Sequence, residues 1–558
     1  MGQRLIIRSA LLGMRKGSCE SLRRDYGTII VGAGAAGIRL ASELVQRGDR
    51  DVLLLEAGAS HAGPQSRVPA YYPCAFGGRL DWCYTTVPQR HLGGRRIPLP
   101  SGKGLGGSTS INAMIWIEPS DGCLLELQEA GGARWGLGTL REELASMRYD
   151  LLGEGYLGTP ALHPNTRCFD LWLRQELGEE STTMERACLG VGAYRRTQQR
   201  GRRVSSAALL RRLAGKLTVL TEAQVEGLEW SGERVIGVKV RLAGESVTMK
   251  GAQVVLCCGA IGTPLLLLQS GVGPAEILRE AGLAVRHALE GVGVGLQDHL
   301  IYPMVYRLGN GEPFGLPMSD DDRRRYVQDG EGPKGSNLSE YGGFFDPFVG
   351  TQGVRVANCG GLASRDGMKL DSAFQWHVTP TNYLRYPRYR AEYPAISVGV
   401  SLCKPRSRGR VWVRRSVESG TSVELQVDPN YFGDPGDLDA LHDAVLWTRG
   451  VLNRLIASTG GAEWVEGSFL RGVEEVFPGK ARGEELVAAT MRKFSTTLYH
   501  YSSSCRLGRD PVAPVDSWLR VKGLEGLYVC DASVLPSVLG CNPQATVQLL
   551  AKRLATWL

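Results

Sequence analysis

A glycine-rich turn near the N-terminus restricts the fold of this chain more than any other feature. Residues 26–31 form a short apolar run rich in β-branched residues, and the turn Gly32-Ala33-Gly34-Ala35-Ala36-Gly37 follows at once. Residues 35–48 then show helical periodicity, and a second apolar run at 51–55 ends at Glu56. This order predicts a βαβ unit and, with it, a parallel sheet of the α/β class.

The three glycines of this turn have separate roles in binding a dinucleotide. Gly32 permits the tight turn, Gly34 lets a pyrophosphate approach the backbone, and Gly37 allows the helix to pack on the strand. The phosphates then face the free N–H groups of a helix N-terminus, and Glu56 accepts hydrogen bonds from a ribose diol. The turn therefore predicts an adenine dinucleotide, with a glycine-rich packing turn as the alternative. It does not separate NAD from FAD.

Composition excludes several classes of protein. The chain has 558 residues, enough for two or more domains or for one large α/β domain with a second layer, and its 43% hydrophobic and 22% charged residues are typical of a globular protein. The net charge of +8 is a mild bias over this length, and the basic runs are short and lack interleaved aromatics, so we expect no nucleic-acid partner. No uninterrupted apolar stretch of about 18 residues is present, so no transmembrane segment is predicted.

Cysteine and histidine spacing gives no indication of a metal site. The 13 cysteines include no C-x-x-C pair, and the eight histidines form neither H-E-x-x-H nor H-x-H. A disulfide scaffold and a structural metal are both disfavoured, and a reducing compartment is the simpler interpretation.

The first 25 residues differ from the rest of the chain. They hold six basic residues interspersed with apolar ones, and no acidic residue precedes Glu20. Such a leader is typical of a mitochondrial presequence, so residues 1–25 predict a mitochondrial protein. The alternative is a frayed N-terminal extension on a cytoplasmic protein.

Two further glycine-rich stretches identify a family. Residues 101–116 read Ser-Gly-Lys-Gly-Leu-Gly-Gly-Ser-Thr-Ser-Ile-Asn-Ala-Met-Ile-Trp, and residues 259–273 read Gly-Ala-Ile-Gly-Thr-Pro-Leu-Leu-Leu-Leu-Gln-Ser-Gly-Val-Gly. Together with the N-terminal turn they resemble the glucose-methanol-choline oxidoreductases, which bind FAD. The resemblance continues through Arg203-Val204-Ser205, Leu296-Gln297-Asp298-His299 and a C-terminal block from Val515 to Asn542.

This resemblance implies an α/β fold of two domains. A doubly wound, Rossmann-type FAD-binding domain would be assembled from the discontinuous segments 26–150, 200–300 and 496–558. An α+β substrate-binding domain would be inserted as residues 151–199 and 301–495.

The resemblance also implies the residues that contact the cofactor. It assigns the pyrophosphate to the three glycines of the turn, the adenosine ribose to Glu56, and the adenine to the backbone of Val225. The remaining contacts, along the flavin and over the pyrophosphate, fall on Gly102, Gly106, Gly107, Ser108, Asn112, Ala113, Asp531, Ala532, Pro543 and Gln544. Relatives with covalent flavin attach it through a histidine within the stretch 108–112, and this chain has none there. We therefore expect noncovalent FAD.

A histidine and an asparagine near the C-terminus are the candidate catalytic pair. Alcohol oxidation by a flavin requires removal of the hydroxyl proton while a hydride leaves the same carbon for flavin N5. A neutral imidazole suits the proton step, and an amide donor stabilises the developing alkoxide. The resemblance places these two groups at His500 and Asn542. Without it, a core histidine and a turn asparagine would be the simpler interpretation.

Several alternatives remain open. The leading function is an FAD-dependent alcohol dehydrogenase, choline-like or acting on another primary alcohol, with an electron acceptor that the sequence does not identify. A hydroxynitrile lyase-like member and a noncatalytic FAD-binding paralogue are the alternatives.

A choline site would need an aromatic cage, for which Trp82, Trp376 and Tyr499 are available. The chain has Ser503-Ser504 where the family usually has Gly-Thr, and this departure leaves the fit of the substrate in doubt. We assign His299 and His377 no specific role.

Overall fold

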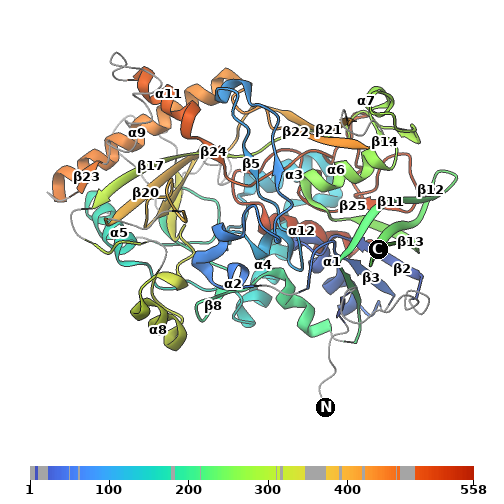
Figure 1. Ribbon diagram of the computed structural model, residues 1–558, viewed down its shortest axis with the longest axis horizontal. Coiled ribbons are helices and arrows are strands. Elements are labelled where there is room, and N and C mark those ends of the chain that lie inside the picture. The colour runs from blue at the N-terminus through green and yellow to red at the C-terminus, as the bar shows by residue number, and fades with distance from the viewer. Residues whose placement is uncertain are drawn as a thin grey trace.

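The computed structural model describes most of the chain (Figure 1). It covers residues 7–9, 23–49, 51–60, 63–177, 182–213, 215–308, 311–314, 318–345, 373–388, 393–416, 422–459, 462–464 and 484–558. Most of the predicted leader 1–25 lies outside these residues. Within the leader, the short strand β1 (Ile7–Ser9) pairs in parallel with β10 (Thr218–Thr221).

A mainly parallel sheet carries the predicted βαβ unit. Strand β2 (Asp25–Val31) and strand β3 (Val52–Leu55) pair in parallel on either side of helix α1 (Ala35–Gln46) in the sequence. The sheet order is β1-β10-β3-β2-β13-β12-β11, and β25 pairs with β13. The remaining strands are β11 (Ala223–Ser231), β12 (Arg234–Leu242), β13 (Glu245–Leu256) and β25 (Leu527–Val529).

The long strand β13 joins two parts of this sheet. Its first half pairs antiparallel with β12, and its second half pairs in parallel with β25, which comes from the C-terminal segment. The carboxyl ends of β25, β13, β2 and β3 therefore meet at one edge of the sheet. Ligands bind outside this edge in α/β proteins.

Helix α1 is buried along almost its whole length. Residues 36–45 are buried because the helix packs between the parallel sheet and helix α12 (Gln544–Leu554). Arg39 of α1 spans this contact, donating from Nη2 to Gln548 at 3.2 Å and pairing with Glu43 at 3.2 Å. The first and last helices of the fold are thus packed together (Figure 1).

A second, antiparallel sheet lies on the other side of the molecule, toward the left of Figure 1. Its order is β18-β19-β20-β17-β23, with β24 paired to β17. These strands are β17 (Leu300–Leu308), β18 (Tyr341–Phe345), β19 (Phe374–Thr379), β20 (Ala395–Leu402), β23 (Ala462–Trp464) and β24 (Thr496–Thr497). A separate three-stranded sheet consists of β16 (Val294–Leu296), β21 (Gly409–Arg415) and β22 (Val423–Asp428).

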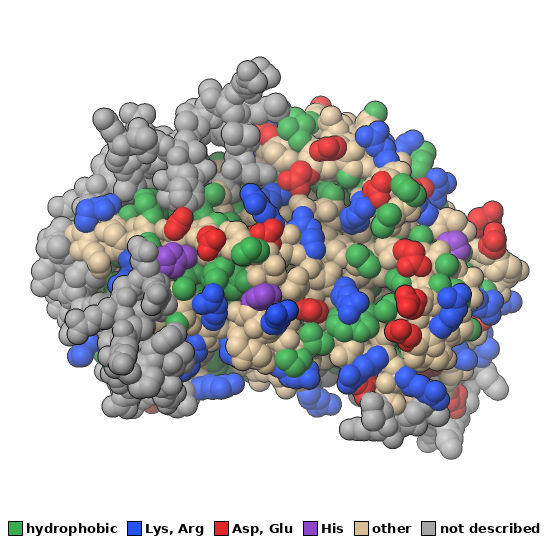
Figure 2. Space-filling view, turned by 90° about the horizontal axis from the view of Figure 1, so that it is seen from above, with side chains coloured by type: hydrophobic (Ala, Val, Ile, Leu, Met, Phe, Trp, Pro, Cys, Tyr) green, Lys and Arg blue, Asp and Glu red, His purple; other side chains and the backbone are tan. Residues whose placement is uncertain are grey.

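Helices surround both sheets. They are α2 (Pro64–Arg67), α3 (Asp121–Gly131), α4 (Leu137–Gly153), α5 (Pro164–Leu177), α6 (Gly259–Gln269), α7 (Ala275–Glu280), α8 (Asp320–Asp329), α9 (Pro435–Thr459) and α11 (Glu484–Phe494). Among the described residues no helix combines the length and the apolar character needed to cross a bilayer. Basic and acidic side chains are interspersed over the face seen in Figure 2.

Residues 309–343 are rich in Gly, Pro and Asp, and this composition predicts long loops. The prediction is wrong for Asp320–Asp329, which form helix α8. Ser319 accepts the backbone N–H of Asp322, and the Asp322 carboxylate accepts the Ser319 N–H in return. This capping box, with three acidic residues in the first turn, stabilises the helix start.

Candidate active site

The dinucleotide side of the site is built from the turns that follow parallel strands. The N-cap of α1 is Gly34, no side chain caps it, and no acidic residue occupies the first turn of the helix. The positive end of the α1 dipole is therefore open to an anion. A Cβ placed on Gly34 or on Gly259 would meet no atom within 4 Å, so both turns border open space.

Two glycine-rich loops touch at a distance that only glycine allows. A Cβ on Gly107 would lie 2.8 Å from the Cα of Gly34, and Gly106 donates its N–H to the carbonyl of Ala33 at 2.9 Å. A Cβ on Gly37 would lie 2.0 Å from the carbonyl oxygen of Gly32. Gly37 therefore supports close packing of α1 on its turn.

Glu56 fastens three backbone segments at the carboxyl end of β3. Its carboxylate accepts the N–H groups of Ala33 at 3.0 Å, Gly58 at 2.8 Å and Gly104 at 2.9 Å. Burial raises the pKa of this carboxyl, and the three N–H donors oppose the increase. Asp531, which follows β25, holds the first turn of α6 in the same way. Its carboxylate accepts hydrogen bonds from the Gly259 N–H at 2.9 Å and from Thr263 Oγ1 at 2.6 Å.

A cavity of about 350 Å³ joins this side to the candidate catalytic pair. Fifteen of the seventeen predicted site residues line it. They are Gly32, Gly34, Glu56, Gly102, Gly107, Ser108, Asn112, Ala113, Val225, His500, Asp531, Ala532, Asn542, Pro543 and Gln544. The other two, Gly37 and Gly106, lie behind the cavity wall.

His500 and Asn542 face each other in this cavity. His500 Nε2 lies 3.1 Å from Asn542 Nδ2, and His500 Nδ1 lies 2.8 Å from Nδ1 of His299. The His500 backbone N–H donates to Asp298 Oδ1 at 2.8 Å, which fixes the chain next to Tyr499. Tyr499 itself has a φ of 68°, a conformation that is costly for a non-glycine residue and is found at functional sites.

His500 and its two neighbours, His299 and His377, are all neutral near pH 7. Burial lowers the pKa of His299 to about 4 and that of His377 to about 3. Burial, reinforced by the other two imidazoles, also lowers the pKa of His500 well below its usual value. An uncharged imidazole with one free lone pair is a proton acceptor.

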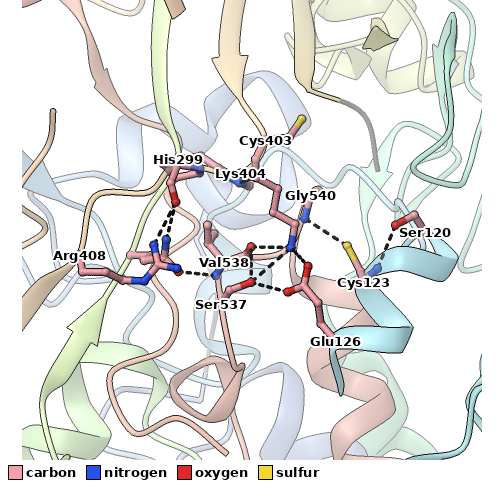
Figure 3. Close-up of polar contacts among 12 residues, drawn as sticks. Ser120, Cys123, Glu126, His299, Cys403, Lys404, Arg408, Ser537, Val538 and Gly540 are labelled. Carbon is pink, nitrogen blue, oxygen red and sulfur yellow. Dashed lines mark hydrogen bonds and ion pairs between the residues drawn. The ribbon is translucent and has the colours of Figure 1, made fainter. Parts of the chain in front are cut away.

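The loop that carries Asn542 is held by a polar cluster (Figure 3). Lys404, which follows β20, pairs with Glu126 of α3 at 2.5 Å, and Ser537 Oγ donates to the other oxygen of the same carboxylate at 2.5 Å. The N–H of Gly540 donates to the sulfur of Cys123, in α3, at 3.2 Å. These contacts restrain the loop two residues before Asn542.

Arg203 supports the glycine-rich loop of the site, a role that no motif spacing in the sequence predicts. It is buried, donates to Asn112 Oδ1 at 2.7 Å and to the carbonyls of Thr109 and Asn112, and burial lowers its pKa to about 9. Asn112 in turn donates to Gln544 at 2.7 Å. A single arginine thus orients the loop 108–112 against the start of α12.

The aromatic candidates separate into two groups. Trp82 and Tyr499 line the cavity, whereas Trp376 does not. Trp376 lies on the opposite face of β19, where it is buried against Phe345 and Trp447 and donates to Thr448 at 3.0 Å. Of the three aromatic residues that the sequence offers for a substrate cage, Trp376 therefore lies outside this cavity.

Comparison with known proteins identifies the family. Two models of GMC oxidoreductases match the chain, over residues 26–301 and 405–551. The chain belongs to the GMC oxidoreductase family. It is thus an FAD-dependent oxidoreductase that acts on CH–OH groups. The open N-terminus of α1 and the glycine cradle fit the pyrophosphate of FAD, and Glu56 lines the same cavity.

Similar proteins of known name include two bacterial enzymes. An alcohol dehydrogenase [acceptor] of Pseudomonas putida is 30% identical over 557 residues, covering 95% of each chain. An oxygen-dependent choline dehydrogenase of Pectobacterium carotovorum subsp. carotovorum (strain PC1) is 30% identical over 577 residues, covering 95% of this chain and 94% of its own.

Solved structures share the fold. Pyridoxine 4-oxidase from Mesorbium loti superposes with a TM-score of 0.76 at 25% identity, covering 95% of this chain and 99% of its own. A variant of the formate oxidase of Aspergillus oryzae RIB40 superposes with a TM-score of 0.80 at 22% identity, covering 95% and 97%.

Proposed function

We propose that this protein is an alcohol dehydrogenase in which His500 accepts the hydroxyl proton of the substrate. The observation that carries the proposal is the position of the His500–Asn542 pair in the same cavity as the FAD turns. Bound FAD supplies the hydride acceptor. The P. putida relative named alcohol dehydrogenase supports the same reaction class.

The two side chains have complementary chemistry. A neutral His500 offers a lone pair for the hydroxyl proton. The Asn542 amide donates to the oxygen as negative charge develops on it and does not compete for the proton. Tyr499 and Leu498 line the cavity beside this pair.

The lining of the substrate end favours an uncharged alcohol with an apolar or aromatic group. Tyr72, Phe76, Tyr383 and Tyr499 gather there, with Phe76 and Tyr499 at 5.4 Å between ring centroids. The described lining holds two carboxylates, Glu56 and Asp531, and both are bound to donors on the dinucleotide side. No described acidic side chain is therefore available to pair with a substrate cation.

Choline is the second candidate substrate. Aromatic rings bind a trimethylammonium group without a carboxylate, and the same four side chains supply such rings. The choline dehydrogenase relative supports this candidate. Benzyl alcohol and choline are similar in size and differ in charge, so a comparison of the two separates the candidates.

Anaerobic mixing tests the proposal directly. The purified flavoprotein is mixed with benzyl alcohol, a series of primary n-alcohols and choline, and the flavin absorbance is followed by stopped flow. We expect bleaching by the uncharged alcohols, and a reduction rate lowered by about 10²- to 10⁴-fold in His500→Ala with flavin still bound. His287→Gln is the matched control, because the His287 ring hydrogen-bonds to the Lys522 carbonyl and does not line the cavity.

The outcomes separate the alternatives. A bound flavin that no alcohol reduces would support the lyase-like or noncatalytic alternative, and cyanide release from a hydroxynitrile would distinguish those two. Reoxidation under air or by a quinone would identify the electron acceptor.

We also propose that FAD is held without a covalent bond. The stretch 108–112 presents Ser108, Thr109 and Ile111 to the cavity and no histidine. Acid precipitation should release all of the flavin into the supernatant. Flavin retained in the pellet would contradict this proposal.

A further inference from the structure

Two chains of hydrogen bonds converge on His500 from opposite sides, and each begins at a backbone carbonyl. A carbonyl oxygen can only accept, so it fixes the direction of every bond that follows. We propose that His299 and Gln375 are positioning residues that set the tautomer of His500, with the proton on Nδ1 and an unprotonated Nε2 that faces Asn542. This inference rests on the proposed role of His500 as base.

The first chain starts at the carbonyl of Cys403, next to Lys404 (Figure 3). His299 Nε2 lies 2.8 Å from this oxygen, so Nε2 carries the proton of that ring. The ring is buried and neutral, so its Nδ1 is an acceptor. His500 Nδ1, 2.8 Å away, must then be the donor. A neutral His500 that donates from Nδ1 has an unprotonated Nε2.

The second chain starts at the carbonyl of Trp376 on β19. Tyr194 donates its hydroxyl to this oxygen at 2.5 Å and accepts from Gln375 Nε2 at 3.2 Å. Gln375 Nε2 also donates to Asn542 Oδ1 at 3.1 Å. The amide group of Asn542 is thereby turned with its NH₂ toward His500.

Both chains reach the same conclusion for His500 Nε2. Asn542 Nδ2 donates to it at 3.1 Å, which requires a lone pair there, and the His299 chain independently requires the same state. In the other tautomer, a protonated Nε2 of His500 would face the Asn542 NH₂ group, which is also a donor, and an unprotonated Nδ1 would face Nδ1 of His299, which is also an acceptor. Such mismatches are costly in a buried site.

The tautomer matters because only an unprotonated Nε2 accepts the substrate proton. The orientation of a catalytic imidazole by a partner on its other nitrogen is a general requirement for base catalysis. His299 and Gln375 do not enter this step, since they act through His500 and Asn542. Neither residue lines the cavity.

A matched pair of variants at position 299 tests the first chain. In His299→Asn the amide oxygen can take the place of Nδ1 and still accept from His500. In His299→Gln the longer amide reaches the Cys403 carbonyl and leaves His500 Nδ1 without an acceptor. We expect the rate of flavin reduction at saturating alcohol to fall at least about 10-fold further in His299→Gln than in His299→Asn, with KM nearly unchanged. Equal rates in the two variants would overturn the proposal.

Gln375→Met tests the second chain. Methionine has a similar size but cannot donate to Asn542 Oδ1, so the amide of Asn542 loses its fixed orientation. We expect a lower reduction rate at saturating alcohol and an unchanged flavin content. A wild-type rate in this variant would refute the role of Gln375.

A spectroscopic readout is independent of turnover. Ring ¹⁵N resonances of the oxidised holoenzyme without alcohol, with His500 assigned by its loss in His500→Ala, report which nitrogen carries the proton. We expect a protonated Nδ1 and an unprotonated Nε2 in the wild type. The opposite pattern would overturn the proposal even if the variants fail to fold. Failure of the proposed function differs from both, because the wild-type flavin would then not be reduced at all.

Discussion

Ser503 has a backbone conformation that suits glycine. Its φ is 71°, its side chain is 2% exposed, and its hydroxyl makes no hydrogen bond within the described structure. The family usually has glycine here, and the departure from it raised doubt about the substrate pocket. Neither Ser503 nor Ser504 lines the cavity, so the departure affects stability and not the shape of the site. We expect Ser503→Gly to stabilise the protein.

The magnitude follows from three terms. Relief of a left-handed conformation returns about 1 to 2 kcal/mol, and removal of a buried unpaired hydroxyl returns at least about 1 kcal/mol. The additional freedom of glycine in the unfolded chain costs about 0.4 to 1 kcal/mol. The net gain is about 2 kcal/mol. Because the unfolding entropy scales with chain length, this gain corresponds to a Tm increase of about 2 °C in a protein of this size.

Ser504→Gly is the matched control. The Ser504 hydroxyl donates to the carbonyl of Ala260 at 2.5 Å, and its φ is not positive. The same chemical change should therefore lower Tm by about 2 °C, since it removes a buried hydrogen bond and adds unfolded-state entropy. Calorimetry of both holoenzymes at one flavin occupancy gives the difference. A Ser503→Gly protein that melts no higher than wild type, or two variants that shift in the same direction, would refute the reasoning.

Three other perturbations give expected outcomes. Gly34→Val should leave the apoprotein folded, because the φ of Gly34 is −88° and a Cβ there would meet no atom within 4 Å. The valine side chain would enter the space for the pyrophosphate, so the flavin content measured by absorbance should fall while the circular dichroism spectrum stays unchanged. Full flavin content would contradict this location of the pyrophosphate. Arg203→Lys should weaken FAD retention at least about 10-fold, measured by fluorescence during dialysis, because lysine cannot make the forked contacts to Asn112, and unchanged retention would refute that role. Acidification should destabilise the wild type through His299, because its pKa is about 4 in the folded state and about 6.5 in the unfolded state. The contribution of His299 to the free energy of unfolding is fully present above pH 6.5 and falls by up to about 3 kcal/mol as the pH approaches 4. Asp298, with its pKa raised to about 7, contributes with the opposite sign, so the readout is the difference in Tm-against-pH slope between wild type and His299→Asn, and equal slopes would contradict the assignment.

Local sequence patterns were sufficient for the cofactor half of the site. The strand, turn and helix of residues 25–46 depend on contacts between near neighbours, and the predicted strand at 26–31 and helix at 35–48 differ from the structure by at most two residues at each end. The family resemblance then placed the remaining glycine loops. The division of the chain into two domains stays a prediction, and β24, which lies in the segment 496–558 assigned to the FAD-binding domain, pairs with β17 of the antiparallel sheet.

The polar chains around His500 had no local signal. His299 and His500 are separated by 201 positions, and Gln375 and Asn542 by 167, so no spacing rule connects them. Each contact exists because β17, β19 and the C-terminal loop meet at one end of the cavity. A lone histidine in a sequence is usually a core residue, and only the donor and acceptor partners of the folded state show otherwise.

The alternation of side chains along β19 shows how a single register choice separates core from site. Phe374, Trp376 and Val378 belong to the buried apolar cluster, while His377 and Thr379 line the cavity and Gln375 contacts Asn542. Both sets contain buried side chains, so hydrophobicity alone does not decide which face is which. The decision comes from α9, because Trp447 of that helix stacks on Phe345 at 4.7 Å and approaches Trp376 at 5.6 Å.

The aromatic contact with α9 therefore has a consequence for catalysis. A slip of one residue in β19 would send Gln375 into the apolar cluster and Trp376 toward Asn542. The tryptophan stack opposes this slip by the large apolar area that it buries. Trp447→Ala should thus weaken the orientation of Asn542 from a distance, lowering the rate of flavin reduction at saturating alcohol along with stability. An activity loss in Trp447→Ala that Gln375→Met does not reproduce would show that the stack acts on the site by another route.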